Sequence, residues 1–442
     1  MTEVPKLVNK CILKSKNIPL MDLEVSVTEK TINGYSYKKH ELTSCYLYGE
    51  NAHLLPKEIA SSDNLKEAFF IWLHRRQISD KRNISNRIKY FLKDNNANWQ
   101  FSFMEVGRGV SLNDTFWVLP YDSDLRWEDW SPYRNPLDKE IAEIAFTAFL
   151  YDFPKEYHKG PLVPRITAEP TTPGVMRKCW VNKEDGIYLW KAYDWRIMSG
   201  NRTPVIMEYY AAQLAKAMEI PHIPYTLFRN TRINGQEEII SECPLFTSED
   251  VGFVSAASVI EASGISWDKH NSDSPLLQRQ LAELFGESFY ADMMLFDAIF
   301  LNYDRHLGNF GMLINNNTGK YLGPAPLFDN GATFLFSEQN LNSIKSRPRE
   351  VLPYSGAYML FDEAALIFVE ERHIPMLKRL TEFQFRQPED PNLGVDDKVL
   401  AQMNRIIRER SKHIIKLFKM RRRRQLPTIE IAGLKKLKAL VD

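Results

Sequence analysis

The sequence predicts an α+β protein in which a strand-rich segment is followed by a mostly helical one, with a separate α+β region in front of both. Three observations support this. Alternating apolar and polar residues, typical of strands, are concentrated before Pro244, and apolar residues recur at helical spacing after Leu276. A turn-rich stretch with five prolines, Pro154–Pro173, divides the N-terminal region from the rest. Strands followed by helices favour a two-lobed α+β domain.

Length and composition exclude several classes of protein. The chain has 442 residues, of which 44% are hydrophobic and 26% charged, so collagen-like, mucin-like and wholly disordered proteins are excluded. Four widely spaced cysteines without a C-x-x-C pair argue against a disulfide scaffold and a zinc ribbon. The start, Met1–Lys14, lacks the apolar core of a signal peptide, and the best apolar stretch, Met293–Leu301, is too short to span a bilayer. We therefore expect a cytoplasmic protein without membrane contact.

The N-terminal region reads as an accessory domain over residues 1–153. Alternation predicts strands at 22–28 and 44–48, a strand-like aromatic segment at 99–117, and helices at 65–76, 84–92 and 141–151. Residues 122–136 contain tryptophans, acids and prolines and are predicted to be loop.

Two lobes are predicted after the proline-rich junction. A strand–turn–strand at 175–193, a helix at 204–218 and strands at 226–229 and 237–243 form the first lobe, residues 154–250. Helices dominate the second lobe, residues 251–425, and a basic tail follows at 426–442.

The strongest chemical signal is the segment Asn302–Asn309, which follows a predicted apolar helix at 289–301. Asp304 is followed five residues later by Asn309, with Arg305 and His306 beside the aspartate, and this is the spacing of a kinase catalytic loop. Phosphoryl transfer needs one carboxylate to accept or orient the proton of the attacking hydroxyl. It also needs a neutral oxygen ligand for Mg²⁺.

A second carboxylate should bridge the metal ions from a separate strand end. Asp329 lies 20 residues beyond Asn309, after the apolar residues Pro326–Phe328, which predict a short strand. Gly331 would let the backbone turn close to a ligand.

A kinase also needs a cation for the nucleotide phosphates and a carboxylate that holds this cation. Lys191 ends an alternating segment, and Glu208 lies 17 residues later on the predicted helix. The turn Thr171–Gly174 is the candidate phosphate-covering loop, in which Thr171, Thr172 and the backbone at Gly174 would meet phosphate oxygens. The segment 238–246, with Glu242 and Cys243, would contact adenine.

Each signal has a simpler explanation when it is taken alone. An Asp-Arg-His sequence is commonly a surface turn, Phe-Asp-Asn-Gly makes a good turn, and Lys191 with Glu208 would be an ordinary surface pair. Their order along the chain favours the phosphotransferase interpretation over coincidence.

The segment Asn302–Gly311 resembles the N-x-D-R-H-x-x-N-x-G signature of HipA-like bacterial serine/threonine protein kinases, and Leu327–Gly331 resembles their metal-binding segment. Residues 220–225 also resemble the segment that follows the family's long helix. The likeness covers roughly residues 165–420 and implies a protein-kinase-like fold, ATP and Mg²⁺ as cofactors, and a Ser/Thr protein acceptor. It implies Asp304 as catalytic base, Asn309 and Asp329 as metal ligands, and Lys191 as phosphate ligand.

The resemblance also implies partners. Family members often act as toxins paired with a DNA-binding antitoxin, so an antitoxin-like partner or a mobile-element context is expected. Ser111–Trp117 resembles a motif in the accessory region of longer HipA-like proteins, which sets this chain apart from the best-known toxins.

The C-terminal end is strongly basic. Residues 401–442 contain 13 Lys/Arg and 3 Asp/Glu, and apolar residues recur at helical spacing from Leu400 to Phe418. Arg421–Arg424 extend this helix, so the tail is either a nucleic-acid contact or the solvated face of a helix.

The sequence thus predicts an ATP- and Mg²⁺-dependent Ser/Thr protein kinase of HipA-like type. Two alternatives remain. One is a lipid or small-molecule phosphotransferase with the same fold, and the other is a nucleic-acid-binding or scaffold protein with a degenerate kinase fold.

Overall fold

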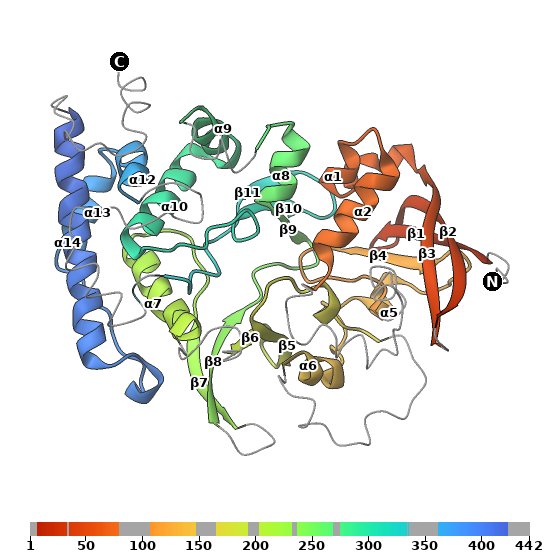
Figure 1. Cartoon of the computed structure of the whole chain (residues 1–442), viewed down its shortest axis with the longest axis horizontal. Helices are drawn as coiled ribbons and strands as arrows, with labels where there is room; N and C mark the ends of the chain where they lie inside the picture. The colour runs from red at the N-terminus through yellow and green to blue at the C-terminus, as the bar shows by residue number, and fades with distance from the viewer. Residues whose placement is uncertain are drawn as a thin grey trace.

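The computed structural model of the chain describes residues 7–32, 35–78, 107–146, 165–192, 203–231, 237–267, 275–333, 335 and 361–422. Several predicted features lie outside these ranges, namely the helix at 84–92, most of the aromatic segment at 99–117, the boundary at 153/154, and residues 423–442. Figure 1 shows the described elements in an elongated arrangement, with the N-terminal strands at one end and the C-terminal helix at the other.

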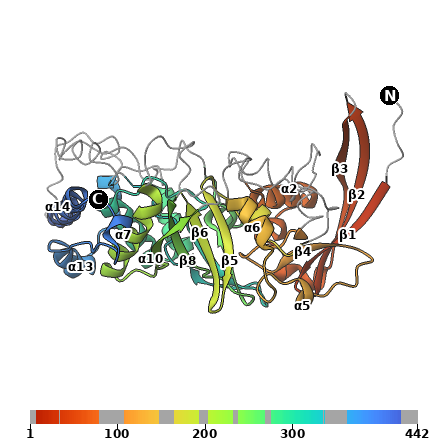
Figure 2. The same cartoon turned by 90° about the horizontal axis from the view of Figure 1, so that it is seen from below.

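The N-terminal part, residues 7–146, is built on an antiparallel sheet with the strand order β3-β2-β1-β4. The strands are β1 (Leu7–Ser15), β2 (Ile18–Ile32), β3 (Tyr35–Leu47) and β4 (Phe116–Pro120). Its helices are α1 (Lys57–Ala60), α2 (Leu65–Arg76), α5 (Trp127–Trp130) and α6 (Lys139–Phe146), with a 3₁₀ turn at Gly49–Leu54. Figure 2 shows the long β2–β3 hairpin standing out from the body of the protein. The stretch 122–136, predicted to be loop, contains the short helix α5.

The predicted helix at 65–76 is present with the same bounds. It begins at Asn64, whose side-chain oxygen accepts a hydrogen bond from the Glu67 backbone N–H, while the Asn64 amide donates to the Glu67 carboxylate. The first of these bonds satisfies a backbone N–H that a helix start leaves unpaired, and the second holds the two side chains together. Phe69, Trp72 and Leu73 are buried on its inner face, as their spacing predicts.

A second antiparallel sheet has the order β5-β6-β8-β7. Its strands are β5 (Arg177–Lys183), β6 (Gly186–Ala192), β7 (Thr226–Thr231) and β8 (Glu237–Pro244), and α7 (Thr203–Ala217) connects β6 to β7. A 3₁₀ turn at Glu169–Thr171 precedes β5. Lys191 lies opposite Lys178 on one neighbouring strand and opposite Ser241 on the other. Because directly opposed residues point to the same face of a sheet, these three side chains share one face.

The two sheets share a hydrophobic core. Cys179, Ala192 and Ile240 of the second sheet belong to the same buried cluster as Trp72 and Ile141 of the N-terminal part. The N-terminal part is therefore packed against the second sheet through apolar side chains, and is not a module joined only by a linker.

The helical part surrounds α10, whose residues Tyr290–Phe300 are almost all buried. Its helices are α8 (Ala256–Ser263), α9 (Pro275–Phe285), α10 (Glu287–Phe300), α12 (Phe361–Phe368), α13 (His373–Leu380) and α14 (Asp397–Arg422), with a 3₁₀ turn at Pro391–Leu393. A small sheet, β11-β10-β9, lies between this part and the N-terminal part (Figure 1). Its strands are β9 (Val251–Ser255), β10 (Gly311–Asn315) and β11 (Tyr321–Pro324).

The sequence did not predict β10 and β11, and the short strand predicted at Pro326–Phe328 is wrong. Leu327 forms only an isolated bridge to His222. No helix within the described ranges is long and apolar enough to cross a membrane. None of the four cysteines forms a disulfide.

Candidate active site

Lys191 and Glu208 form a buried ion pair between the second sheet and α7. The Lys191 Nζ lies 2.9 Å from a Glu208 carboxylate oxygen, and both residues are at most 3% exposed. The other Glu208 oxygen accepts the Asn330 backbone N–H at 2.9 Å. Glu208 therefore holds both the lysine and the segment that contains Asp329.

Asp329 is the second carboxylate on Lys191, at 2.8 Å from Nζ. Burial alone would raise the pKa of Asp329, but the ammonium groups of Lys191 and Lys178 outweigh it and hold the pKa well below its usual range. Asp329 has a φ of +54°, a conformation that costs a non-glycine residue of order 1–3 kcal/mol and is often found at active sites. The Asp329 backbone N–H donates to the Tyr225 hydroxyl at 3.2 Å, which helps to hold this geometry.

Gly331 is required by close packing against α7, and not by a ligand as the sequence predicted. A Cβ at this position would lie 2.0 Å from the Pro204 carbonyl oxygen and 3.2 Å from Cγ of Glu208. Glycine thus lets the Asp329 segment lie directly against α7.

The loop 302–309, called the catalytic loop below, starts where α10 ends at Leu301 in a left-handed conformation with φ +57°. The Asp304 side chain is exposed, while the Asn302 side chain accepts the Asp304 backbone N–H at 3.1 Å. The neighbouring protein displaces water from Asp304 and so raises its pKa. The negative charge of Asp329 also raises this pKa, while His306 and Arg305 lower it by less, so the net shift is upward. Asp304 is thus a better proton acceptor than a free aspartate.

Arg305 fixes the catalytic loop to the protein interior. Its guanidinium binds the Asp297 carboxylate of α10 at 2.9 and 3.0 Å, and both residues are 0% exposed. It also donates to the Asn309 carbonyl at 2.8 Å and to the Phe328 carbonyl at 3.3 Å. One buried arginine therefore joins α10, the catalytic loop and the Asp329 segment.

Asn309 and Asp329 offer the hard oxygen atoms that Mg²⁺ prefers. The Asn309 amide nitrogen donates to the Asp304 carbonyl at 2.9 Å, which leaves the amide oxygen as the atom available to a cation. This donor set fits a magnesium ion, although no cluster of three or more His, Cys, Asp or Glu side chains suited to a metal occurs among the described residues. A metal held here would depend on nucleotide phosphates for further ligands.

The arrangement of the whole chain can be compared with known proteins. No protein-family profile and no curated protein sequence matches it. HipA of Shewanella oneidensis MR-1, solved in complex with HipB and operator DNA, superposes with a TM-score of 0.52 at 10% identity, over 92% of this chain and 99% of that one. The fold is the HipA kinase fold. The proinflammatory kinase CtkA of Helicobacter pylori is 16% identical, with a TM-score of 0.41 over 58% of this chain and 94% of that one.

Within this HipA-like fold, the threonines of the predicted phosphate loop, residues 171–174, have structural positions. Both are buried, Thr171 at 3% and Thr172 at 6% exposure. The Thr171 hydroxyl donates to the Val110 carbonyl at 2.7 Å, and the Thr172 hydroxyl donates to the Ala168 carbonyl at 2.7 Å. The prediction that these hydroxyls meet phosphate is wrong for this conformation, because they already bind main-chain oxygens. Gly174, with φ +97°, is the part of the loop whose backbone lies next to Lys178.

Lys178 is the residue that the sequence analysis missed. It is 6% exposed and lies directly opposite Lys191, and its Nζ would be 2.5 Å from a Cβ placed on Gly174. The ammonium group of Lys178 therefore lies next to the phosphate loop and near Asp329, as a second positive charge beside that of Lys191. Pairing β5 with β6 across the two-residue turn would have revealed this lysine.

Glu242 and Cys243 point to opposite faces of β8. The Glu242 side chain binds Lys183 and Trp190 on the face away from Lys191, so it does not point into the site around this lysine. Cys243 is on the Lys191 face, in an apolar cluster with Tyr225 and Phe328, where burial raises its pKa to about 12. It can form part of an apolar wall.

Three aromatic rings extend this wall towards the small sheet. Phe246 stacks on Phe328 with ring centroids 5.3 Å apart, and Phe253 packs edge-on against both. All three are partly exposed. They supply the apolar surface that a nucleotide base needs beside Asp329.

Proposed function

We propose that this protein is an ATP- and Mg²⁺-dependent Ser/Thr protein kinase. The observation that carries the proposal is the buried Lys191, held by Glu208 at 2.9 Å and by Asp329 at 2.8 Å, in a HipA-like fold with an exposed Asp304 at its catalytic loop. In this proposal Lys191 and Lys178 bind nucleotide phosphates, and Asn309 and Asp329 hold Mg²⁺, which supplies charge neutralisation when bound. Asp304 accepts the proton of the acceptor hydroxyl.

The direct test is incubation with Mg²⁺ and γ-labelled ATP, alone and with cell extract. Labelled serine or threonine in a protein supports the proposal. Label only in lipid or a small molecule supports the alternative phosphotransferase. Absence of both transfer and ATP binding would favour the scaffold alternative.

Lys191→Met is expected to lower kcat/KM for ATP by roughly 10²–10³-fold, the size of effect seen when one preorganised charge is removed. Glu208→Gln should cost less, because Lys191 keeps its contact with Asp329. Steady-state kinetics at varied ATP measures both variants, and urea unfolding checks that each is folded. Equal losses in the two variants would contradict this assignment of roles.

Partner binding is a further part of the proposal. HipA in the compared structure is bound to HipB and operator DNA. We propose a comparable antitoxin-like partner and a cytoplasmic location for this protein, and we propose that α14 contacts a polyanion such as nucleic acid.

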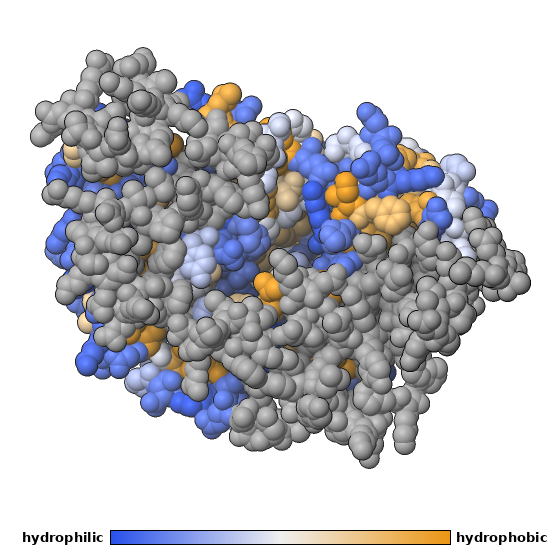
Figure 3. Space-filling model, viewed as in Figure 1, coloured by the Kyte–Doolittle hydropathy of each residue, from blue (hydrophilic) through white to orange (hydrophobic). Residues whose placement is uncertain are grey.

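The described part of α14 shows which of its basic side chains are free to contact a polyanion. Arg421 and Arg422 extend the basic helix as predicted. The Arg421 guanidinium donates to the carbonyls of Leu366 and Val369, so it is held by the protein and is not free to meet a polyanion. Lys412, Lys416 and Lys419 remain exposed at helical spacing on one face. Hydrophilic residues follow this edge of the molecule in Figure 3, at the end opposite the N-terminal sheet.

Changing Lys412, Lys416 and Lys419 together to glutamine should weaken binding to double-stranded DNA and reduce its salt dependence. Each lost phosphate contact makes the slope of log K against log salt less negative by about 0.9. Titrations at several salt concentrations measure this, with Arg379→Gln on α13 as a control that removes a single positive charge from another helix. An unchanged slope in the triple variant would remove the polyanion proposal and leave the kinase proposal intact.

A further inference from the structure

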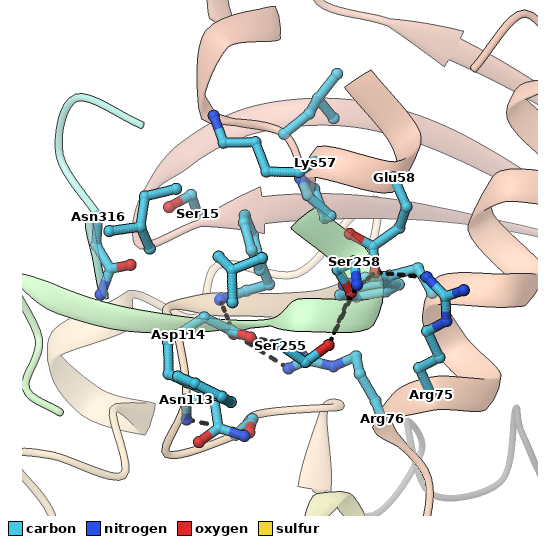
Figure 4. Close-up of a pocket in the computed structure, with 18 of the residues that line it drawn as sticks. Ser15, Lys57, Glu58, Arg75, Arg76, Asn113, Asp114, Ser255, Ser258 and Asn316 are labelled. Atoms are coloured by element: carbon cyan, nitrogen blue, oxygen red, sulfur yellow. Dashed lines mark hydrogen bonds and ion pairs between the residues drawn. The ribbon is translucent and has the colours of Figure 1, made fainter. Parts of the chain in front are cut away.

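A cavity of about 270 Å³ lies where the N-terminal part meets the kinase-like part (Figure 4). On one side it is lined by α1, α2 and the segment before β4. On the other side it is lined by the end of β9, the start of α8 and the β10–β11 turn. Pro173 of the phosphate loop and Gly308 of the catalytic loop also reach it. The cavity is smaller than the roughly 300–1,000 Å³ pockets that hold drug-sized ligands, and it suits one or two side chains.

The cavity lies close to the reacting centre. Gly308 directly precedes Asn309, whose amide donates to the Asp304 carbonyl at 2.9 Å. Phe253, another lining residue, packs against Phe328, which directly precedes Asp329. A chain bound in this cavity can therefore extend over the catalytic loop to Asp304.

Lys57 is the cation in this cavity that lacks an acidic partner. Its Nζ donates to the Gly319 carbonyl at 2.6 Å and lies 5.5 Å from the centre of the Tyr321 ring, and no carboxylate of the described residues is within ion-pair distance. Burial lowers the pKa of Lys57, because no negative charge offsets the loss of water. A carboxylate bound next to it would supply that charge.

The other charged groups of the lining are already matched. Arg76 binds Asp114, and Arg75 binds Glu261 on α8. The buried Glu58 accepts the Ser258 hydroxyl at 3.0 Å and has the Arg75 guanidinium 3.9 Å away as its charged partner. In Figure 4, Lys57 and Glu58 lie on one side of the pocket and Asn113 and Asp114 on the opposite side. The unmatched charge of the cavity is thus the positive charge of Lys57.

Polar and apolar groups complete the lining. The Asn113 side chain makes no hydrogen bond to any residue that the structure describes, while its carbonyl accepts the Phe253 backbone N–H at 2.7 Å. Trp72, Phe116 and Phe253 supply apolar surface. A short acidic side chain on a peptide fits this combination, with its carboxylate at Lys57 and its stem and backbone against the rings and the Asn113 amide.

We propose that this cavity binds an acidic side chain of the protein acceptor next to the residue that is phosphorylated, so that the N-terminal part forms the acceptor site. This inference rests on the proposed kinase function. It gives the N-terminal part a role in choosing the substrate, with aspartate or glutamate near the acceptor hydroxyl as the preferred sequence.

A library of Ser/Thr peptides with Asp, Glu, Ala or Lys fixed at each flanking position tests the proposal. The unchanged protein should prefer Asp or Glu over Ala at one position by roughly 10- to 100-fold in kcat/KM, as expected for a charge-assisted hydrogen bond. Lys57→Ala should remove this preference through KM for the peptide, and Lys57→Glu should favour lysine. Lys320→Ala is the matched control, because its exposed side chain lies beside the cavity without lining it.

Two outcomes overturn the proposal. One is an acidic preference that persists in Lys57→Ala, or that never occurs in the unchanged protein. The other is a rise in KM for ATP rather than for the peptide in Lys57→Ala, which would show that the cavity holds part of the nucleotide.

A second measurement does not depend on catalysis. Asn113→Cys is labelled with an anionic and with a cationic methanethiosulfonate, and mass spectrometry reads the modification of residue 113 apart from the four native cysteines. Adding Lys57→Ala should lower the anion-to-cation rate ratio several-fold, whereas adding Lys320→Ala should not. An unchanged ratio overturns the anion site. If the ratio falls as expected but no peptide, protein or extract component is phosphorylated, the kinase function has failed, and with it the acceptor role.

Discussion

Asp304→Asn is expected to reduce phosphoryl transfer by roughly 10²–10⁴-fold while ATP binding stays close to that of the unchanged protein. The main-chain bonds that shape the loop do not use the Asp304 side chain, since they run from Asn302 to the Asp304 N–H and from Asn309 to the Asp304 carbonyl. Asparagine keeps the shape of the side chain but cannot accept the proton as a carboxylate does.

The measurement pairs ATP titration with a transfer assay, and Asp329→Ala is the contrasting variant. Asp329→Ala should lose Mg²⁺-dependent ATP binding as well as transfer, because it removes a metal ligand and one carboxylate from Lys191. Full turnover in Asp304→Asn would exclude Asp304 as the base.

The pH dependence provides a second check on Asp304. A base must be deprotonated, and the pKa of this carboxyl is raised by its surroundings. As the pH falls, Asp304 should take up its proton at a higher pH than an ordinary aspartate, and kcat/KM should decline there. Asp329, with its lowered pKa, remains ionised over the same range.

Arg305→Met is expected to lower the free energy of unfolding by about 3–5 kcal/mol, the cost of removing one partner from a buried ion pair. Both Arg305 and Asp297 are 0% exposed, so the substitution would leave a buried carboxylate with Asn302 as its remaining side-chain donor at 2.9 Å. The catalytic loop and the Asp329 segment would also lose the carbonyl contacts that Arg305 makes.

Urea unfolding followed by circular dichroism measures this effect. Arg379→Met is the control, because its pair with Glu219 is exposed at 56% and 76% and should contribute about 0–1 kcal/mol. If Arg305→Met does not fold, the double variant Arg305→Met with Asp297→Asn should recover much of the stability, since it removes the unpaired charge. A loss in Arg305→Met no larger than that of Arg379→Met would contradict the anchoring role.

Much of the fold was predictable because its signals are local. The helix at 65–76 follows from apolar residues three and four apart after an Asn cap, and its bounds agree with α2. The strands at 177–183 and 186–192 and helix α7 were predicted to within a few residues. Strands β10 and β11 were missed because they are short, and because β10 is ordered by pairing with β9, far away in the sequence, while β11 pairs with β10.

The site was predicted in part for the same reason. The placement of Lys191 on a strand and of Glu208 on the next helix is readable along the chain, and the structure brings their side chains within 2.9 Å. Lys178 was missed because nothing local marks it, whereas its register opposite Lys191 places it there. The sequence did not show that the Glu242 side chain faces away from Lys191, because the residues of β8 that share a face with Lys191 are set by the pairing of β6 with β8.

The sequence by itself determined the order of the chemical groups: a lysine on a strand, a glutamate on the next helix, an Asp…Asn loop after an apolar helix, and a later aspartate. Periodicity and motif spacing express these features within a few neighbouring residues, so they are readable without contacts. Only the tertiary structure decided the engagement of Thr171 with Val110, the burial of Arg305 against Asp297, and the cavity that Lys57 shares with Gly308. Each of these depends on which distant residues share a buried environment, because hydrogen bonding and charge pairing there are set by the packing of whole elements and not by the adjacent sequence.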